Sequence, residues 1–167
     1  MNMDDYFDGA SVEKKKILII DWSNACHRYI FTAQSDVEKS ILDPLQESDP
    51  NDLYRFWKIN ITQGLLNYVK MFKPDKLIVA LDCKWNWRKK IYPDYKGNRD
   101  EKREQSAVDF KIFYPIMNEF TEVLKKQIPN ACFLYCDDCE ADDSIAILSR
   151  EVFHEDDVVI VSTDRDF

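Results

Sequence analysis

Four short apolar runs without polar alternation punctuate the chain. Continuous runs of this kind are typical of strands that are buried on both faces of a parallel sheet. Each is short enough for a strand, and the third is the weakest. The four predicted strands are residues 14–21, 75–82, 131–136 and 157–164.

Segments of helical length separate these runs: residues 23–33, 52–72, 108–128 and 141–153. Pro74 and Pro129 each fall between a helix and the next strand, where a helix stop belongs. Strands that alternate with helices predict an α/β fold with a mostly parallel central sheet flanked by helices on both faces. A polar, mobile loop is expected over 34–51.

Length and composition fit one globular domain of 167 residues. We expect a flexible tail over residues 1–15 and the domain over 16–167. The acidic start lacks the basic end and apolar middle of a signal peptide, and no apolar run approaches the roughly 18 residues that span a bilayer. These features predict a cytoplasmic protein. Its net charge of -8 argues against a surface built for indiscriminate phosphate binding.

Acidic residues follow every predicted strand. Asp21, Asp82 and Asp164 end three of them, Asp166 follows two positions later, and the remaining strand runs into Glu140, Asp142 and Asp143. Ligands of open parallel sheets gather beyond the carboxyl ends of the strands. Any one of these residues could be only a helix cap or a turn residue, but that interpretation is harder to apply to all four strand ends.

Seven carboxylates at one sheet edge would repel one another unless cations neutralised them. Hard oxygen ligands favour Mg²⁺ or Mn²⁺, and two ions are the natural number for this set. Glu140 and Asp143 can share a helix face, whereas Asp142 points about 100° away from Asp143.

The five cysteines are an odd number and are expected to be free thiols in a reducing compartment. Cys136 and Cys139 have the C-x-x-C spacing of a redox pair, but the acidic neighbours Asp137 and Asp138 disfavour the thiolate. A zinc site that uses Cys132 lacks an obvious fourth ligand. We therefore interpret Cys136 and Cys139 as packing residues.

Residues 84–103 carry eight basic and three acidic residues in an otherwise acidic chain. Lysine and arginine contact phosphates, and aromatic rings stack on exposed bases, so the segment suits single-stranded or frayed nucleic acid. A solvated charged loop is the alternative. The interleaved aromatic residues are Trp85, Trp87, Tyr92 and Tyr95.

Four segments in this order, "LIIDWSN", "VALDCKWNWRKKIYPDYKGNR", "CEADDSIAIL" and "IVSTDRDF", resemble the N-terminal part of the bacteriophage 5′-nuclease family. This flap endonuclease superfamily includes phage-type ribonuclease H and the 5′-nuclease domain of bacterial DNA polymerase I. The resemblance implies a PIN-like 5′-nuclease fold with a basic arch or gateway over about residues 84–105. It also implies a nuclease that hydrolyses phosphodiesters near 5′ ends of DNA, or of RNA paired to DNA, during primer removal in DNA replication.

The resemblance assigns roles to individual residues. The metal ligands for two Mg²⁺ or Mn²⁺ ions are then Asp21, Asp82, Glu140, Asp142, Asp143, Asp164 and Asp166. Lys96 and Arg99 are similar to the family's basic pair beside the scissile phosphate, and with Asp142 they form the expected catalytic set. Arg88 and Tyr95 join Lys96 and Arg99 as expected nucleic-acid contacts.

The sequence stops at "STDRDF", directly after the fourth predicted strand. Members of the family continue with a further metal-binding aspartate and a helix-hairpin-helix-like element. We expect the chain to be truncated before that element, either as a fragment or as one half of a split nuclease whose partner chain supplies the rest. Two other hypotheses stay open: a nucleic-acid-binding or assembly module without activity, and, less favoured, a receiver-like domain with Asp82 as phosphoacceptor.

Overall fold

A four-stranded parallel sheet forms the centre of the protein in this computed structural model, which describes residues 13–41, 52–97, 103–165 and 167. The strands are β1 (Lys16–Asp21), β2 (Lys76–Leu81), β3 (Ala131–Tyr135) and β4 (Asp157–Val161), in the order β3-β2-β1-β4. Because all neighbours are parallel, the four carboxyl ends lie at one edge. The predicted sheet is confirmed, with each strand slightly shorter than expected.

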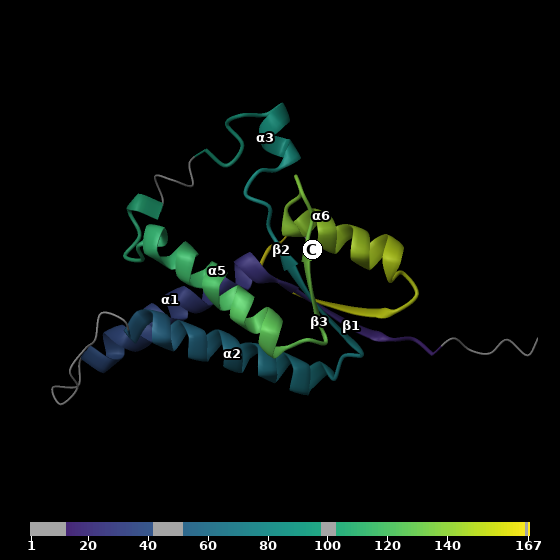
Figure 1. Ribbon diagram of the computed structural model, residues 1–167, viewed down its shortest axis with the longest axis horizontal. Helices are drawn as coiled ribbons and strands as arrows, with labels where there is room; N and C mark the ends of the chain where they lie inside the picture. Colours follow the sequence, from purple (N-terminus) through teal and green to yellow (C-terminus); the bar gives the residue numbers. More distant parts are fainter. Residues whose placement is uncertain (1–12, 42–51, 98–102, 166) are drawn as a thin grey trace, which may run out of the picture.

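Helices cover both faces of the sheet (Figure 1). α1 (Trp22–Ile41), α2 (Asp52–Phe72) and α5 (Phe110–Gln127) pack on one face. α6 (Ala141–Ile147) continues into the π-helical turn η2 (Leu148–Val152) on the other. None of the helices in the described part of the chain is both long and apolar enough to cross a membrane.

Each face of the sheet has its own hydrophobic core. Trp57 of α2 and Phe113 of α5 are fully buried together, with ring centroids 5.0 Å apart in an edge-to-face arrangement. On the opposite face Ile145 of α6 is buried against Ile17 and Ile19 of β1. Alternate residues of the central strands therefore serve different cores, which explains why these strands read as continuous apolar runs.

The expected loop over 34–51 is wrong for its first part, because α1 runs on to Ile41. Polar side chains support this extension. Gln34 donates to Glu38 one turn later at 3.0 Å, and Asn60 of α2 donates to Asp36 at 2.9 Å. A polar composition suggested a loop, but contacts with a second helix stabilise the longer helix. Residues 42–51 lie outside the described part.

The two long helices α1 and α2 meet closely at Gly64. A Cβ atom placed there would lie 1.9 Å from the Tyr29 hydroxyl oxygen and 2.4 Å from the ring carbon that carries it. We expect Gly64→Ala to lower the free energy of unfolding by about 1–2 kcal/mol, because the crowding outweighs the better helix propensity of alanine. Urea denaturation of Gly64→Ala, Tyr29→Ala and the double variant measures this. Alanine at 64 should become favourable once Tyr29 is truncated, and additive effects would contradict the crowding.

Candidate active site

Four aspartates from different elements share the carboxyl edge of the sheet. Asp21 ends β1, Asp82 follows β2, and Asp164 lies three residues after β4. Asp142 lies in the first turn of α6. The negative charge of Asp142 interacts with those of Asp82 and Asp164, and Asp21 interacts with both Asp82 and Asp142. The structure thus brings these four of the seven predicted acids together, and Glu140 interacts with Asp142 as well.

Burial and mutual repulsion disfavour ionisation of two of these acids. Burial raises the pKa of Asp21 from 3.8 to about 6, and the charges of Asp82 and Asp142 add to the shift while hydrogen bonds from Ser162 and Asn24 oppose it. The pKa of Asp142 is also raised, first by burial and then by Asp82 and Asp164. Such an edge attracts cations.

Two of the acids also have structural hydrogen bonds. Asp21 accepts the Asn24 backbone N–H at 3.2 Å and the Ser162 hydroxyl at 2.9 Å. Asp82 accepts the backbone N–H of Ala141, the first residue of α6, at 2.8 Å. The alternative interpretation as a local helix cap is therefore correct for Asp21, whereas Asp82 binds the start of a distant helix whose N-cap is Glu140. These hydrogen bonds fix where each carboxylate points.

Glu140 and Asp143 form a pair of their own at the start of α6. Their side chains and backbone N–H groups bond reciprocally in a capping box. Arg88 donates to both oxygens of Asp143, at 2.7 and 2.8 Å, and lies 3.3 Å from Glu140. Lys96 donates to Glu140 at 2.7 Å, and the Tyr95 hydroxyl donates to Glu140 at 3.1 Å. The Arg88 hydrogen bonds lower the pKa of Asp143, so basic residues hold this acidic pair.

The donor chemistry of the edge fits a hard divalent cation, since every clustered ligand is a carboxylate oxygen. Among the described residues, however, no group of three or more His, Cys, Asp or Glu side chains is already gathered closely enough to hold a metal ion. Asp166 lies outside the described part of the chain. The cluster is therefore a set of suitable ligands that approach one another, not a closed metal cage.

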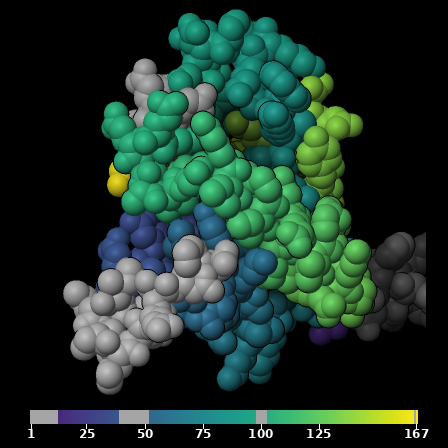
Figure 2. Space-filling view, turned by 60° about the vertical axis from the view of Figure 1, so that its left-hand side comes forward, coloured from purple at the N-terminus to yellow at the C-terminus, as the bar shows by residue number. Residues whose placement is uncertain are grey.

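The basic segment stands over this edge and is anchored to it. It contains the short helix α3 (Trp87–Ile91), whose N-cap Asn86 accepts the Lys89 backbone N–H. Figure 2 shows the teal segment around α3 above the green α5, with a recess between them. Arg88, Tyr95 and Lys96 all reach the acidic pair, so the described part of the segment lies against the rim of the site. Arg99 lies outside the described residues.

Sequence reasoning missed several side chains that orient these acids. Buried Asn86 donates to Glu140 at 3.1 Å. Asn24 accepts both the backbone N–H and the hydroxyl of Thr163, at 3.0 and 2.9 Å, and so ties α1 to the end of β4. An asparagine directly before a short helical run is a recognisable N-cap signal for Asn86. No comparable local signal marked Asn24.

Asp137 and Asp138 lie in the turn between β3 and α6. Asp138 has a φ of 64°, its carbonyl accepts the Trp87 N–H at 2.8 Å, and its carboxylate binds Lys90 at 2.6 Å. All five cysteines are free, as predicted. The packing role is wrong for Cys136, which is exposed because the turn carries it outward. The pKa of Cys139 is raised mainly by a hydrogen bond with Cys136 and, to a smaller extent, by burial.

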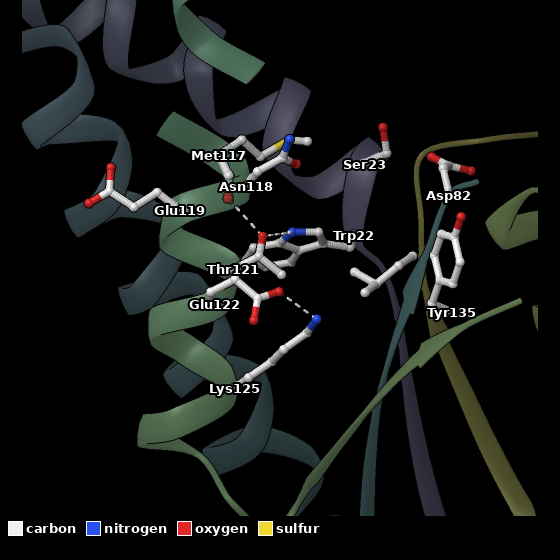
Figure 3. Close-up of a pocket in the computed structure, with 11 residues that line it drawn as sticks. Trp22, Ser23, Asp82, Met117, Asn118, Glu119, Thr121, Glu122, Lys125 and Tyr135 are labelled. Carbon is white, nitrogen blue, oxygen red and sulfur yellow. Dashed lines mark hydrogen bonds and ion pairs between the residues drawn. The ribbon is translucent and has the colours of Figure 1, made fainter. Parts of the chain in front are cut away.

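A hollow of about 410 Å³ opens beside the same edge, between α5 and the ends of β2 and β3 (Figure 3). Asp82 and Tyr135 face each other on one side of it, and Glu122 and Lys125 pair on the other at 2.7 Å. The buried Trp22 indole donates to Thr121 at 2.8 Å and closes the floor. The carboxylate edge is thus accessible from this side.

Comparison with known proteins decides the family. The profile described as "5'-3' exonuclease, N-terminal resolvase-like domain" matches residues 16–167. The chain belongs to this family. The predicted resemblance is therefore confirmed, and the four matched segments contain all seven of the predicted acids.

Three relatives of the family illustrate the extent of the match. The chain is 30% identical over 156 residues to the 5'-3' exonuclease of Buchnera aphidicola subsp. Schizaphis graminum, and 27% identical over 157 residues to the ribonuclease H of Enterobacteria phage T4. Each match covers 92% of this chain and 48% of the relative. DNA polymerase I of Streptococcus pneumoniae is 27% identical over 161 residues, 16% of its length. The chain spans about half the length of the first two relatives.

Solved structures share the fold. A T5 protein co-crystallised with metal ions matches with a TM-score of 0.63 at 22% identity, covering 91% of this chain and 49% of that one. A bacteriophage T5 flap endonuclease in a pseudo-enzyme-product complex with DNA and metal ions matches with a TM-score of 0.62 at 23% identity, covering 90% and 50%. The parallel α/β architecture is thus that of 5′-nucleases.

The raised pKa of Asp21 gives the site a pH signature. Between pH 3.8 and about 6 the folded chain keeps a proton that the unfolded chain releases, so this group lowers the free energy of unfolding as pH rises through that window. We expect Asp21→Asn to stabilise the chain above pH 6 by about 3 kcal/mol and to have little effect below pH 3.8. Urea denaturation in a metal chelator measures the difference, with Asp137→Asn as control. A pH-independent difference would contradict the shift.

Proposed function

We propose that the chain is the catalytic part of a metal-dependent 5'-3' exonuclease or flap endonuclease, which hydrolyses phosphodiesters near 5′ ends of DNA or of RNA in RNA/DNA duplexes, in primer removal during DNA replication. One observation carries the proposal. Carboxylates from four elements share one sheet edge, and basic side chains from the segment above reach the acids beside them. Family membership makes phosphodiester hydrolysis the chemistry that this arrangement suits.

The carboxylates are the proposed ligands of two Mg²⁺ or Mn²⁺ ions. Asp21, Asp82, Asp142 and Asp164 lie at the edge, while Glu140 and Asp143 contribute from their paired positions and Asp166 from outside the described residues. When bound, such ions lower the pKa of water and neutralise charge on the phosphodiester. Because the hydrogen bonds to Asp21 and Asp82 fix their carboxylates, little reorganisation of these two side chains is needed on binding.

The basic residues have the proposed role of holding the scissile phosphate. Lys96 and Arg88 each keep a cationic group within hydrogen-bond distance of the acidic pair, so a phosphate that approaches the carboxylate edge meets both. The Arg88 guanidinium carbon also lies 5.9 Å from the centre of the Tyr95 ring, and the Lys96 ammonium lies 4.9 Å from it. Arg99 completes the proposed set of nucleic-acid contacts, with Arg88, Tyr95 and Lys96.

The direct test is to incubate the chain with three labelled substrates, a 5′-flap, a nicked duplex and an RNA/DNA hybrid, in Mg²⁺ or Mn²⁺ and in chelator. We expect metal-dependent cleavage near the 5′ end, and the substrate with the highest kcat/KM identifies the preference. Absence of cleavage on every substrate, in a chain that still binds the metal and the nucleic acid, would reject catalysis by this chain alone.

A second proposal is an inactive nucleic-acid-binding or assembly module, or one half of a split nuclease. The observation that favours it is that Arg88 and Lys96 already pair with Asp143 and Glu140, two of the proposed metal ligands. This hypothesis predicts binding without cleavage, and cleavage when a polypeptide that corresponds to the relatives' remaining half is added. The same substrates distinguish it from the first proposal.

The cysteines before α6 are not needed for the proposed cleavage. Cys136 is exposed, and in the described part of the chain neither thiol is hydrogen-bonded to the clustered aspartates. In reducing buffer we therefore expect Cys136→Ser/Cys139→Ser to keep kcat within about twofold of the unmodified chain, a change below 0.5 kcal/mol. A loss of tenfold or more, with folding intact by circular dichroism, would assign the sulfurs a part in the chemistry.

A further inference from the structure

Three cysteines gather where the proposed acids meet, and the proposed function uses none of their sulfur. Cys83 directly follows Asp82, and Cys139 directly precedes Glu140. The Cys83 N–H donates to the Cys139 carbonyl at 3.0 Å, which joins the two chain segments. Cys136 begins the turn that leads into Cys139. A covalent change at these sulfurs would therefore act directly beside the carboxylate edge.

The turn holds Cys136 and Cys139 at a separation that a disulfide can span. The Cys139 N–H donates to the Cys136 carbonyl at 3.3 Å, which closes a four-residue turn with Asp138 at its third position. Turns of this type keep their first and last Cα atoms within about 7 Å, and disulfides join Cα atoms about 4.4–6.8 Å apart.

The three thiols differ in how exposed they are to solvent. Cys136 is exposed, Cys139 is partly buried, and Cys83 is buried with its Sγ 3.0 Å from the Tyr135 hydroxyl oxygen. A reagent from solution therefore meets Cys136 first, and Cys139 is the neighbour able to resolve the product. Cys132 is exposed as well, on the edge strand β3, and supplies a comparison thiol outside the turn.

We propose that Cys136 and Cys139 form a reversible disulfide modification site, whose oxidant is a small-molecule disulfide of the glutathione class. The Cys136 thiolate attacks the reagent and releases one thiolate. Cys139 then attacks the Cys136 sulfur of the mixed disulfide and releases the second. Two cysteine thiols are oxidised, one disulfide is reduced to two thiols, and the two protons pass to the released thiolates.

The bond would constrain the turn on which the basic segment rests. The Asp138 carbonyl and carboxylate anchor Trp87 and Lys90, and Glu140 follows the turn directly. Residues that orient metal ligands typically change metal affinity about 10-fold when altered. We expect the oxidised chain to bind Mg²⁺ about tenfold more weakly. One further expectation rests on the proposed function: cleavage by the oxidised chain should fall in proportion to its Mg²⁺ affinity.

The test equilibrates the chain in buffers of oxidised and reduced glutathione and then blocks free thiols. Peptide mapping by mass spectrometry identifies which cysteines are joined, and isothermal titration measures the affinity of the chain for Mg²⁺. Cleavage of the flap substrate is measured in parallel. We expect one intramolecular Cys136–Cys139 bond, the same bond in Cys132→Ser, and arrest at the mixed disulfide in Cys139→Ser. Excess reduced dithiol should restore Mg²⁺ affinity.

The outcomes separate this inference from the proposed function. A stable mixed disulfide at Cys136 in the unmodified chain, or pairing of Cys139 with Cys83, overturns the site. An oxidised chain with unchanged Mg²⁺ affinity overturns its effect on the edge. If the reduced chain binds Mg²⁺ but cleaves nothing, catalysis by the chain fails, while mapping and Mg²⁺ affinity still decide the disulfide.

Discussion

Asp142→Ala is expected to lower metal-dependent cleavage by about a thousandfold. The side chain interacts with both Asp82 and Asp164, so its loss removes charge from the middle of the proposed ligand set. Ligands that position catalytic ions contribute several kcal/mol to the transition state, and each 1.4 kcal/mol is about tenfold in rate. Single-turnover cleavage of the preferred substrate measures the loss, with isothermal titration of Mg²⁺ as a second readout.

The matched control for this variant is Asp137→Ala. Asp137 is an exposed acid in the same segment but is not a proposed metal ligand, so its removal makes the same change in net charge without removing a ligand. Asp142→Asn, which keeps the shape of the side chain, separates the loss of charge from any effect on folding. Cleavage by Asp142→Ala at the rate of Asp137→Ala would remove the carboxylate edge from the mechanism.

Lys96→Ala is expected to lower turnover by about a hundredfold. Its ammonium group lies 2.7 Å from Glu140 and interacts with Asp142, so it stands where it can contact a phosphate held at the edge. Charge that develops on that phosphate in the transition state would lose a pre-positioned cation. Binding should weaken by only about threefold, because one phosphate contact among several is lost.

Comparison of kcat with the dissociation constant tests this role. Lys70→Ala, an exposed lysine near the end of α2, removes the same charge far from the site and should leave both constants unchanged. Equal losses in affinity and turnover for Lys96→Ala would make it a general contact with the nucleic-acid backbone. An unchanged kcat would exclude it from the transition state.

The helix and strand pattern was predictable because each signal is local. The segment over 52–72 coincides with α2, bounded by its acidic first turn and by Pro74 beyond its end. Continuous apolar runs implied strands buried on both faces, and the parallel sheet followed. The error over 34–41 had a tertiary cause, since Asp36 is held by Asn60 of another helix.

The site was only partly predictable, and electrostatics explains the division. That acids follow all four strands is written in the sequence, and parallel pairing alone brings their positions to one edge. The sequence does not show which of these acids pair with basic residues. Glu140 and Asp143 are held by Arg88 and Lys96, whereas Asp21 and Asp142 remain among other carboxylates. Nothing in the spacing of these residues distinguishes the two groups.

The sequence by itself determined the fold class, the family and the set of acids, because apolar periodicity, strand ends and motif order are properties of neighbouring positions. Only the tertiary structure decided which acids repel one another, which are paired with the basic segment, and that Cys136 is exposed on a turn beside Cys139. These properties depend on burial and on contacts between Arg88 and Asp143, 55 positions apart. Only folding brings residues so far apart in the sequence into contact.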